Sequence, residues 1–234
     1  MQTTTEVGMN HSGILASEDA GEKMLQNIEL TKPPRGDETD LAKIRLEYAK
    51  DAEPVGTLPE PQPEGVARVL MDKLGERLAF ERSGTRLYDA LMVKCAADKS
   101  AGVPAKELKH IRDEEAMHFA LVGAAIESLG GDPTAQTPCA DVTGVEGMGL
   151  MQVLNDPKTT LAQALHAILV AEMTDSVGWD ELIELTMQVG NDDLVARFSK
   201  ARDHEKEHLE KISGWYKAAV QGAANSDNLA RKAR

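Results

Sequence analysis

Aromatic side chains are scarce in this sequence of 234 residues, making up only 3% of the total. A core built without them must be mainly aliphatic, and the chain supplies Leu, Ala, Val, Ile and ten Met. Because strands draw on β-branched and aromatic residues, this mix favours helices over sheets. The length suits one domain, or one domain with an arm. The sequence therefore predicts an all-α protein.

The sequence also lacks a disulfide framework and any long apolar run. Its two cysteines, Cys95 and Cys139, are too few for such a framework. No apolar run approaches the ~20 residues that a membrane span needs. Residues 1–30 contain no apolar segment of the kind found in secretory signals. We therefore expect a cytoplasmic protein that does not associate with membranes.

The chain has no surplus of basic residues either, because it contains 39 acidic and 26 basic residues and has a net charge of −13. Such a charge repels nucleic acid, which needs a basic surface, so a nucleic-acid partner is not expected. A surplus of carboxylates can be a solvated surface, or it can provide hard ligands for cations. Only the spacing of the acids distinguishes the two.

Helical patterns and chain breakers divide the chain into two hairpins. Four long helices are predicted, over 65–97, 104–129, 160–189 and 191–220. Short turns at Ser100–Gly102 and at Gly190 join them in pairs. The segment 131–159 is predicted to be irregular, with a short helix over Leu150–Leu154. Because 29 residues can run the length of a ~40 Å helix, we expect a four-helix bundle whose two hairpins are joined by a long crossover.

The ends of the chain are predicted to lie outside this bundle, which covers 64–221. Residues 1–63 have the character of an N-terminal arm with short helices over Ser17–Ile28 and Thr39–Ala52. Four prolines then make Glu53–Glu64 an extended, semi-rigid spacer. Residues 222–234 are predicted to be a flexible tail.

The pattern Glu-x-x-His occurs three times, at Glu107–His110, Glu115–His118 and Glu205–His208. Residues three apart share a helix face and can hold one ion. Carboxylate and imidazole together suit iron or manganese. The pattern alone is suggestive, and pairing across the hairpins is the stronger evidence.

Residues at equal height in a helical hairpin lie symmetrically about its turn. Glu81 and Glu115 are 34 residues apart, and their midpoint falls beside Ser100–Gly102. Glu172 and Glu205 are 33 residues apart, and their midpoint falls beside Gly190. Each hairpin thus carries one Glu and then one Glu-x-x-His at a single level.

All four of these acids fall within apolar helical stripes, and an unpartnered buried carboxylate is very unfavourable. Four acids and two histidines at one level of a core therefore require cations. Buried salt bridges are the alternative. We disfavour them because no Lys or Arg is recognised on these stripes near that level except Arg202. Glu107–His110 points about 80° away from Glu115 and lies ~12 Å lower, so we interpret it as a solvated pair.

These residues resemble the ligand set of the ferritin-like di-iron carboxylate superfamily, with the likeness covering about residues 65–220. The segment Glu76–Tyr88 is similar to the oxidase domain of rubrerythrin, although the two Cys-x-x-Cys pairs of a rubredoxin module are absent. The nearest likeness is to uncharacterised bacterial ferritin-like proteins of the rubrerythrin and stress-induced groups. The resemblance implies metal ligands at six positions: Glu81, Glu115, His118, Glu172, Glu205 and His208.

Other residues near this level have alternative interpretations. Asp175, one turn after Glu172, is an extra ligand, an acceptor for a ligand histidine, or an ordinary surface acid. Tyr88 lies seven residues after Glu81, as a tyrosine does in ferritins, and is either a catalytic neighbour of the metals or a core aromatic. Trp179 is interpreted as packing. His204 and His208 have the spacing of a helical zinc pair, but His204 faces away from the Glu205 stripe.

The resemblance implies two iron ions that react with O2 or hydrogen peroxide, as in a ferroxidase or peroxidase active in oxidative-stress defence. A catalase-like centre with two manganese ions uses similar ligands and stays open. Iron storage in a cage and a scaffold stabilised by metals are further alternatives. The arm favours a small homo-oligomer, most simply a dimer, over a closed shell.

Overall fold

The computed structural model describes Lys43, residues 64–99 and residues 102–232. Apart from Lys43, the predicted arm lies outside these residues, so its helices, its spacer and the domain division stay predictions. The all-α prediction is confirmed, because the described residues form five helices and no strand. The helices are α3 (Gly65–Ala97), α4 (Ala105–Ser128), α5 (Pro138–Asn155), α6 (Leu161–Gln188) and α7 (Asp192–Lys232). None of them is both long and apolar enough to cross a membrane.

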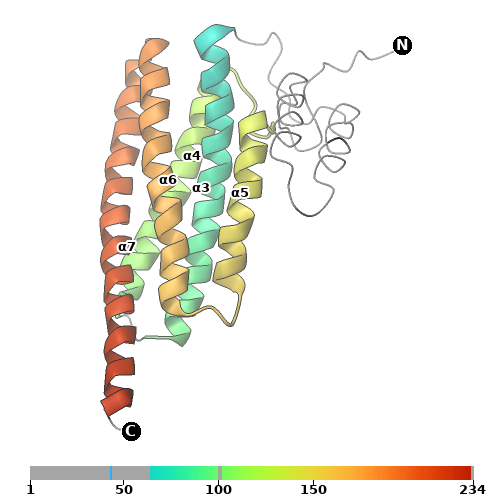
Figure 1. Cartoon of the computed structure of the whole chain (residues 1–234). Coiled ribbons are helices and arrows are strands. Elements are labelled where there is room, and N and C mark those ends of the chain that lie inside the picture. The colour runs from blue at the N-terminus through green and yellow to red at the C-terminus, as the bar shows by residue number, and fades with distance from the viewer. Residues whose placement is uncertain (1–42, 44–63, 100–101, 233–234) are drawn as a thin grey trace, which may run out of the picture.

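The predicted pair of hairpins is confirmed. α3 packs against α4 and α6 packs against α7, while contacts of α3 with α6 and of α4 with α7 close the bundle (Figure 1). Gly190, at φ 74°, makes the turn between α6 and α7. The Asn191 side chain then accepts from the backbone N–H of Leu194 at 3.2 Å, which caps the start of α7. The turn lies at Gly190, where the sequence predicts it, and asparagine is a preferred N-cap residue.

The crossover differs from the prediction, because most of it is the helix α5 of 18 residues. Thr137 caps this helix, Pro138 occupies its first turn, and the Thr137 hydroxyl donates to the backbone carbonyl of Asp72 at 3.1 Å. A Cβ on Gly75 would lie 2.4 Å from the Thr137 hydroxyl, so this glycine permits the close approach of α5 to α3. Packing against α3 thus stabilises a glycine-rich helix that includes the short helix predicted over Leu150–Leu154 and is much longer than it.

The last helix is also longer than predicted. We expected it to end near Val220, whereas α7 continues to Lys232. In Figure 1 its final turns extend past the other helices toward the C-terminus. The helix therefore includes most of the predicted tail.

The bundle interior consists of two apolar clusters with polar residues between them along the helices. One cluster surrounds Leu74, Trp179 and Phe198, and the other surrounds Leu91, Leu108 and Leu165. The buried carboxylates lie at the level between the two clusters. This arrangement excludes water from the carboxylates and leaves them dependent on partners within the protein.

Candidate metal centre

The structure brings all six sequence-predicted ligands together. They come from α3, α4, α6 and α7, and each is at most 3% exposed. Their facing atoms form two groups, within each of which all ligand atoms lie within 4.8 Å of one another. One group is Glu81, Glu115, His118 and Glu205, and the other is Glu115, Glu172, Glu205 and His208. No other such group of three or more occurs among the described residues.

Glu115 and Glu205 belong to both groups, so the two groups form one continuous cluster. Glu81 and His118 belong only to the first group, and Glu172 and His208 only to the second. Two cation positions bridged by two carboxylates are therefore possible, each completed by one further carboxylate and one imidazole. We call them the Glu81/His118 position and the Glu172/His208 position.

Both histidines direct Nδ1 toward the shared carboxylates. Nδ1 of His118 lies 2.6 Å from Oε1 of Glu205 and 3.7 Å from Oε2 of Glu81. Nδ1 of His208 lies 3.0 Å from Oε2 of Glu205 and 3.3 Å from Oε1 of Glu115. Each Nδ1 is thus placed to act as a ligand atom.

The outward ring nitrogens have partners that the sequence analysis missed. Nε2 of His208 donates to Oε2 of Glu114 at 2.9 Å, and Nε2 of His118 lies 3.2 Å from Nδ1 of His204. A carboxylate that accepts from one ring nitrogen orients the imidazole and makes the other nitrogen a better ligand. Glu114 performs the role that was considered for Asp175. His204 contacts a ligand histidine and is not arranged as a zinc pair with His208.

Tyr88 lies beside the cluster, as the sequence suggested, and its hydroxyl donates to Oε1 of Glu172. Its ring is buried in the apolar cluster around Leu91, so it is also a core aromatic. Trp179 packs edge-on against His118, with ring centroids 5.5 Å apart. The packing role that was predicted for Trp179 agrees with this position.

A buried arginine overturns one premise of the sequence analysis. Arg77, four residues before Glu81, is only 2% exposed, and it donates to Asp175 and lies 3.5 Å from Oε1 of Glu81. Arg202, which was named as the sole cation on the stripes, is half-buried and pairs with Asp180 at 3.1 Å. Asp175 is therefore a buried partner of Arg77, not a surface acid, and it belongs to neither group of candidate ligands.

Without cations, the cluster would be electrostatically unfavourable. Burial and the neighbouring carboxylates raise the pKa of Glu81 and Glu115 well above the ordinary value, and they raise the pKa of Glu172 to about 8. Burial opposes ionisation of Glu205, but the two histidines outweigh it and lower its pKa to about 2. Burial also disfavours charge on His208, but its carboxylate partners raise its pKa to about 12. Cations at the cluster would therefore displace protons.

Unsatisfied atoms show that metal ions fit this site. Buried atoms without a hydrogen-bond partner include both carboxylate oxygens of Glu81, one each of Glu115, Glu172 and Glu205, and Nδ1 of His118. Such orphaned polar atoms are rare inside proteins. The charged groups nearest to them, Arg77, His118 and His208, leave them without a hydrogen bond. Hard carboxylates together with imidazoles match the preferences of iron and manganese.

The third Glu-x-x-His lies away from the cluster, as predicted. Glu107 pairs with Lys211 at 3.2 Å, and His110 has its Nε2 3.5 Å from Oε1 of Glu114. The His110 side chain is exposed and that of Glu107 is half-buried, and neither belongs to a group of candidate ligands.

Close packing around Glu115 leads to a first prediction. A Cβ on Gly84 would lie 2.2 Å from Oε2 of Glu115. We expect Gly84→Ala to displace this shared carboxylate, to destabilise the fold by about 1–3 kcal/mol and to reduce metal uptake. Elemental analysis and denaturant titration measure the two effects. Gly123→Ala is the control, since its Cβ would lie 3.8 Å from Leu78, and an equal loss of metal there would contradict the prediction.

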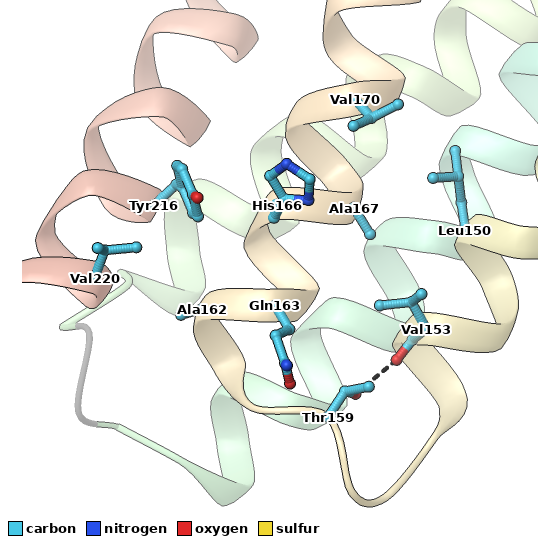
Figure 2. A pocket seen from close by; sticks show the side chains of 10 residues that line it. All are labelled: Leu150, Val153, Thr159, Ala162, Gln163, His166, Ala167, Val170, Tyr216 and Val220. Atoms are coloured by element: carbon cyan, nitrogen blue, oxygen red, sulfur yellow. Dashed lines mark hydrogen bonds between the residues drawn. The ribbon is translucent and has the colours of Figure 1, made fainter. Parts of the chain in front are cut away.

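A separate apolar groove lies between α5, α6 and the end of α7 (Figure 2). It measures about 590 Å³, and its lining includes Val153, His166 and Tyr216. In Figure 2 the Thr159 hydroxyl at its edge donates to the carbonyl of Val153 at 2.6 Å. None of the six candidate ligands lines this groove.

Comparisons with known proteins give little further information. No family model and no curated protein matches the sequence. The fold is similar to a crystal structure described as ferritin like, diiron-carboxylate proteins from Bacillus anthracis str. Ames. The two chains are 17% identical, the match covers 64% of this chain and 97% of the other, and the TM-score is 0.48.

Proposed function

We propose that this chain is a ferritin-like di-metal carboxylate protein that holds two iron ions and reacts with O2 or hydrogen peroxide. The observation that carries the proposal is the pair of buried ligand groups that share Glu115 and Glu205. Two cations bridged by these carboxylates would satisfy the orphaned oxygens and the inward Nδ1 of His118. Oxidative-stress defence is the physiological setting that this chemistry suggests.

Two iron ions so bound supply a redox pair that can exchange two electrons with dioxygen or peroxide. The chain would hold the ions through Glu81 and His118 on one side and through Glu172 and His208 on the other. Glu114 orients His208 by accepting a hydrogen bond from its Nε2, and the Tyr88 hydroxyl orients Glu172 by donating one. Because the six side chains are at most 3% exposed, the site favours substrates of only a few atoms.

The experiment that tests this function supplies iron and manganese together during expression. Elemental analysis of the purified protein identifies the resident metal, and oxygen and peroxide consumption then measure reactivity. Two irons per chain and peroxide-dependent turnover support the proposal. Two manganese ions with evolution of oxygen from peroxide would support the catalase-like alternative. Metal without any reaction would indicate a structural role.

Iron loading provides a second prediction and separates catalysis from storage. Loading should saturate at about two ions per chain, the capacity of one di-metal centre, because the described residues offer no further group of metal ligands. Turnover with peroxide should proceed without mineral growth. We also propose a small oligomer, most simply a dimer, in keeping with the long N-terminal arm. An iron titration with light scattering measures both, and a large particle that retains many irons per chain would contradict them.

A further inference from the structure

A permanent positive charge lies beside only one of the two cation positions. The Arg77 guanidinium is 3.5 Å from Glu81, a candidate ligand of the Glu81/His118 position alone. It is enclosed by Phe80 and Trp179, whose rings lie 4.7 and 5.7 Å from its central carbon. A Cβ on Gly178 would lie 1.5 Å from Nη2, so the guanidinium occupies space that only glycine leaves open. The charge is thus held in place on three sides.

The Glu172/His208 position has the opposite surroundings. Its terminal carboxylate, Glu172, accepts from the uncharged hydroxyl of Tyr88. Its histidine, His208, is backed by the Glu114 carboxylate at 2.9 Å, whereas His118 is backed by the imidazole of His204. A backing carboxylate strengthens a ligand imidazole, and a nearby cation repels a metal ion in a low-dielectric core.

We propose that Arg77 is a positioning residue that makes the Glu81/His118 position the weaker of the two, with Asp175 keeping that position usable by balancing the arginine charge. This inference rests on the proposed function, since it assumes that both positions bind cations. The Arg77 guanidinium lies 3.5 Å from one oxygen of Glu81, and a cation draws more charge from a carboxylate than a neutral hydroxyl does. The Glu172/His208 position therefore fills first, and the Glu81/His118 position fills second.

Asp175 determines how strongly Arg77 acts on the second ion. Arg77 donates to Asp175 and approaches Glu81 with the same nitrogen, Nη1, so the two carboxylates share its charge. When Asp175 is ionised, the buried Arg77–Asp175 pair is close to neutral. Without that carboxylate, the full guanidinium charge acts on Glu81 and on the neighbouring ion. A charge effect of this kind is reversed when the arginine is removed too, whereas a purely structural defect is not.

A double-mutant cycle tests this assignment on the full-length, metal-free protein titrated with Mn²⁺ alone. Electron paramagnetic resonance counts free and bound Mn²⁺ and resolves the two binding steps. Asp175→Asn should weaken the second step about tenfold or more while the first changes by less than about threefold. Arg77→Gln combined with Asp175→Asn should restore the second step to within about threefold of the parent. An unchanged second step in Asp175→Asn, or a second step that stays as weak in the double variant as in Asp175→Asn alone, would overturn the proposal.

The order of filling provides an independent test that does not require the double variant to fold. His118→Ala should retain the tighter Mn²⁺ step, and His208→Ala should retain only the weaker one. The reverse order, or two steps of equal affinity in the parent protein, would overturn this inference and leave the proposed function intact. Fewer than two ions bound by the parent protein would overturn the proposed function itself and this inference with it.

Discussion

Replacing Glu115 and Glu205 together with alanine is expected to abolish the binding of both metal ions. These two residues are the only members common to both ligand groups. Their removal leaves each position with one carboxylate and one imidazole, half of its four candidate ligands. Substitution of a residue that hydrogen-bonds to a metal ligand typically weakens metal binding about 10–100-fold. Loss of two ligands should therefore weaken the binding of each ion by more than about 100-fold. Elemental analysis after desalting measures the retained metal.

The control is the double variant Glu107→Ala, His110→Ala, which removes the third Glu-x-x-His. His110 is exposed, Glu107 is half-buried, and both stand outside the ligand groups. This variant should keep two ions per chain. Retention of both ions by the Glu115, Glu205 variant would show that the site is elsewhere. Loss of metal only in the control would show that the assignment of helix faces is wrong.

Symmetry within the two hairpins explains why the candidate ligands could be predicted from the sequence. Helical geometry relates Glu81 to Glu115 and Glu172 to Glu205 through turns that glycine and short polar segments mark clearly. The same geometry places His118 and His208 one turn beyond the shared acids. These relations depend only on helix pitch and on the position of the turn, so they do not require knowledge of the tertiary packing.

The partners of these ligands depend on packing and were missed for that reason. Glu114 points about 100° away from Glu115 on its own helix, and only the approach of α7 brings it to His208. Arg77 is different, since it lies one turn before Glu81 and its place on that stripe follows from helix geometry alone. The prediction that Arg202 is the only cation on these stripes is wrong for this reason, and a buried arginine is rare unless it is paired.

The helix α5 shows a similar limit. Gly144, Gly147 and Gly149 lower its intrinsic helix propensity, which is why an irregular crossover was expected. Thr137 followed by Pro138 is a helix-start signal that was present in the sequence. The helix-start signal favours a helix, whereas the glycines disfavour one. Contacts with α3 stabilise the helical form.

Removing the metal ions should lower the melting temperature, and the loss should grow as the pH rises. In the empty protein the pKa of Glu81 and Glu115 is raised well above the ordinary value, and that of Glu172 is raised to about 8. The unfolded chain releases these protons near pH 4.5 while the folded chain retains them. Folded carboxylates with raised pKa values therefore stabilise the empty protein at low pH, and this stability is lost as the pH rises toward about 8.

His208 also lowers the stability of the metal-free protein as the pH rises above its pKa in the unfolded chain. Its folded-state pKa is raised to about 12, so the folded state keeps a proton that the unfolded chain has released. Glu205, whose pKa is lowered to about 2, raises the stability of the folded state as the pH rises. This gain does not change further above about pH 5. The sum of these groups still makes the empty protein less stable between about pH 5 and pH 8. Metal ions compete with the same protons, so their binding tightens over that range.

Thermal melts of chelated and loaded protein at pH 5.5, 6.5 and 7.5 measure this linkage. A single ion at one hundred times its dissociation constant adds about 2.7 kcal/mol, which corresponds to roughly 5–10 °C for a chain of this size. The difference in melting temperature between the loaded and the metal-free protein should grow with each increase in pH. The Glu107→Ala, His110→Ala variant should show the same increase. A gap that narrows with rising pH, or an empty protein that melts at or above the loaded one, would show that the buried carboxylates are satisfied without metal.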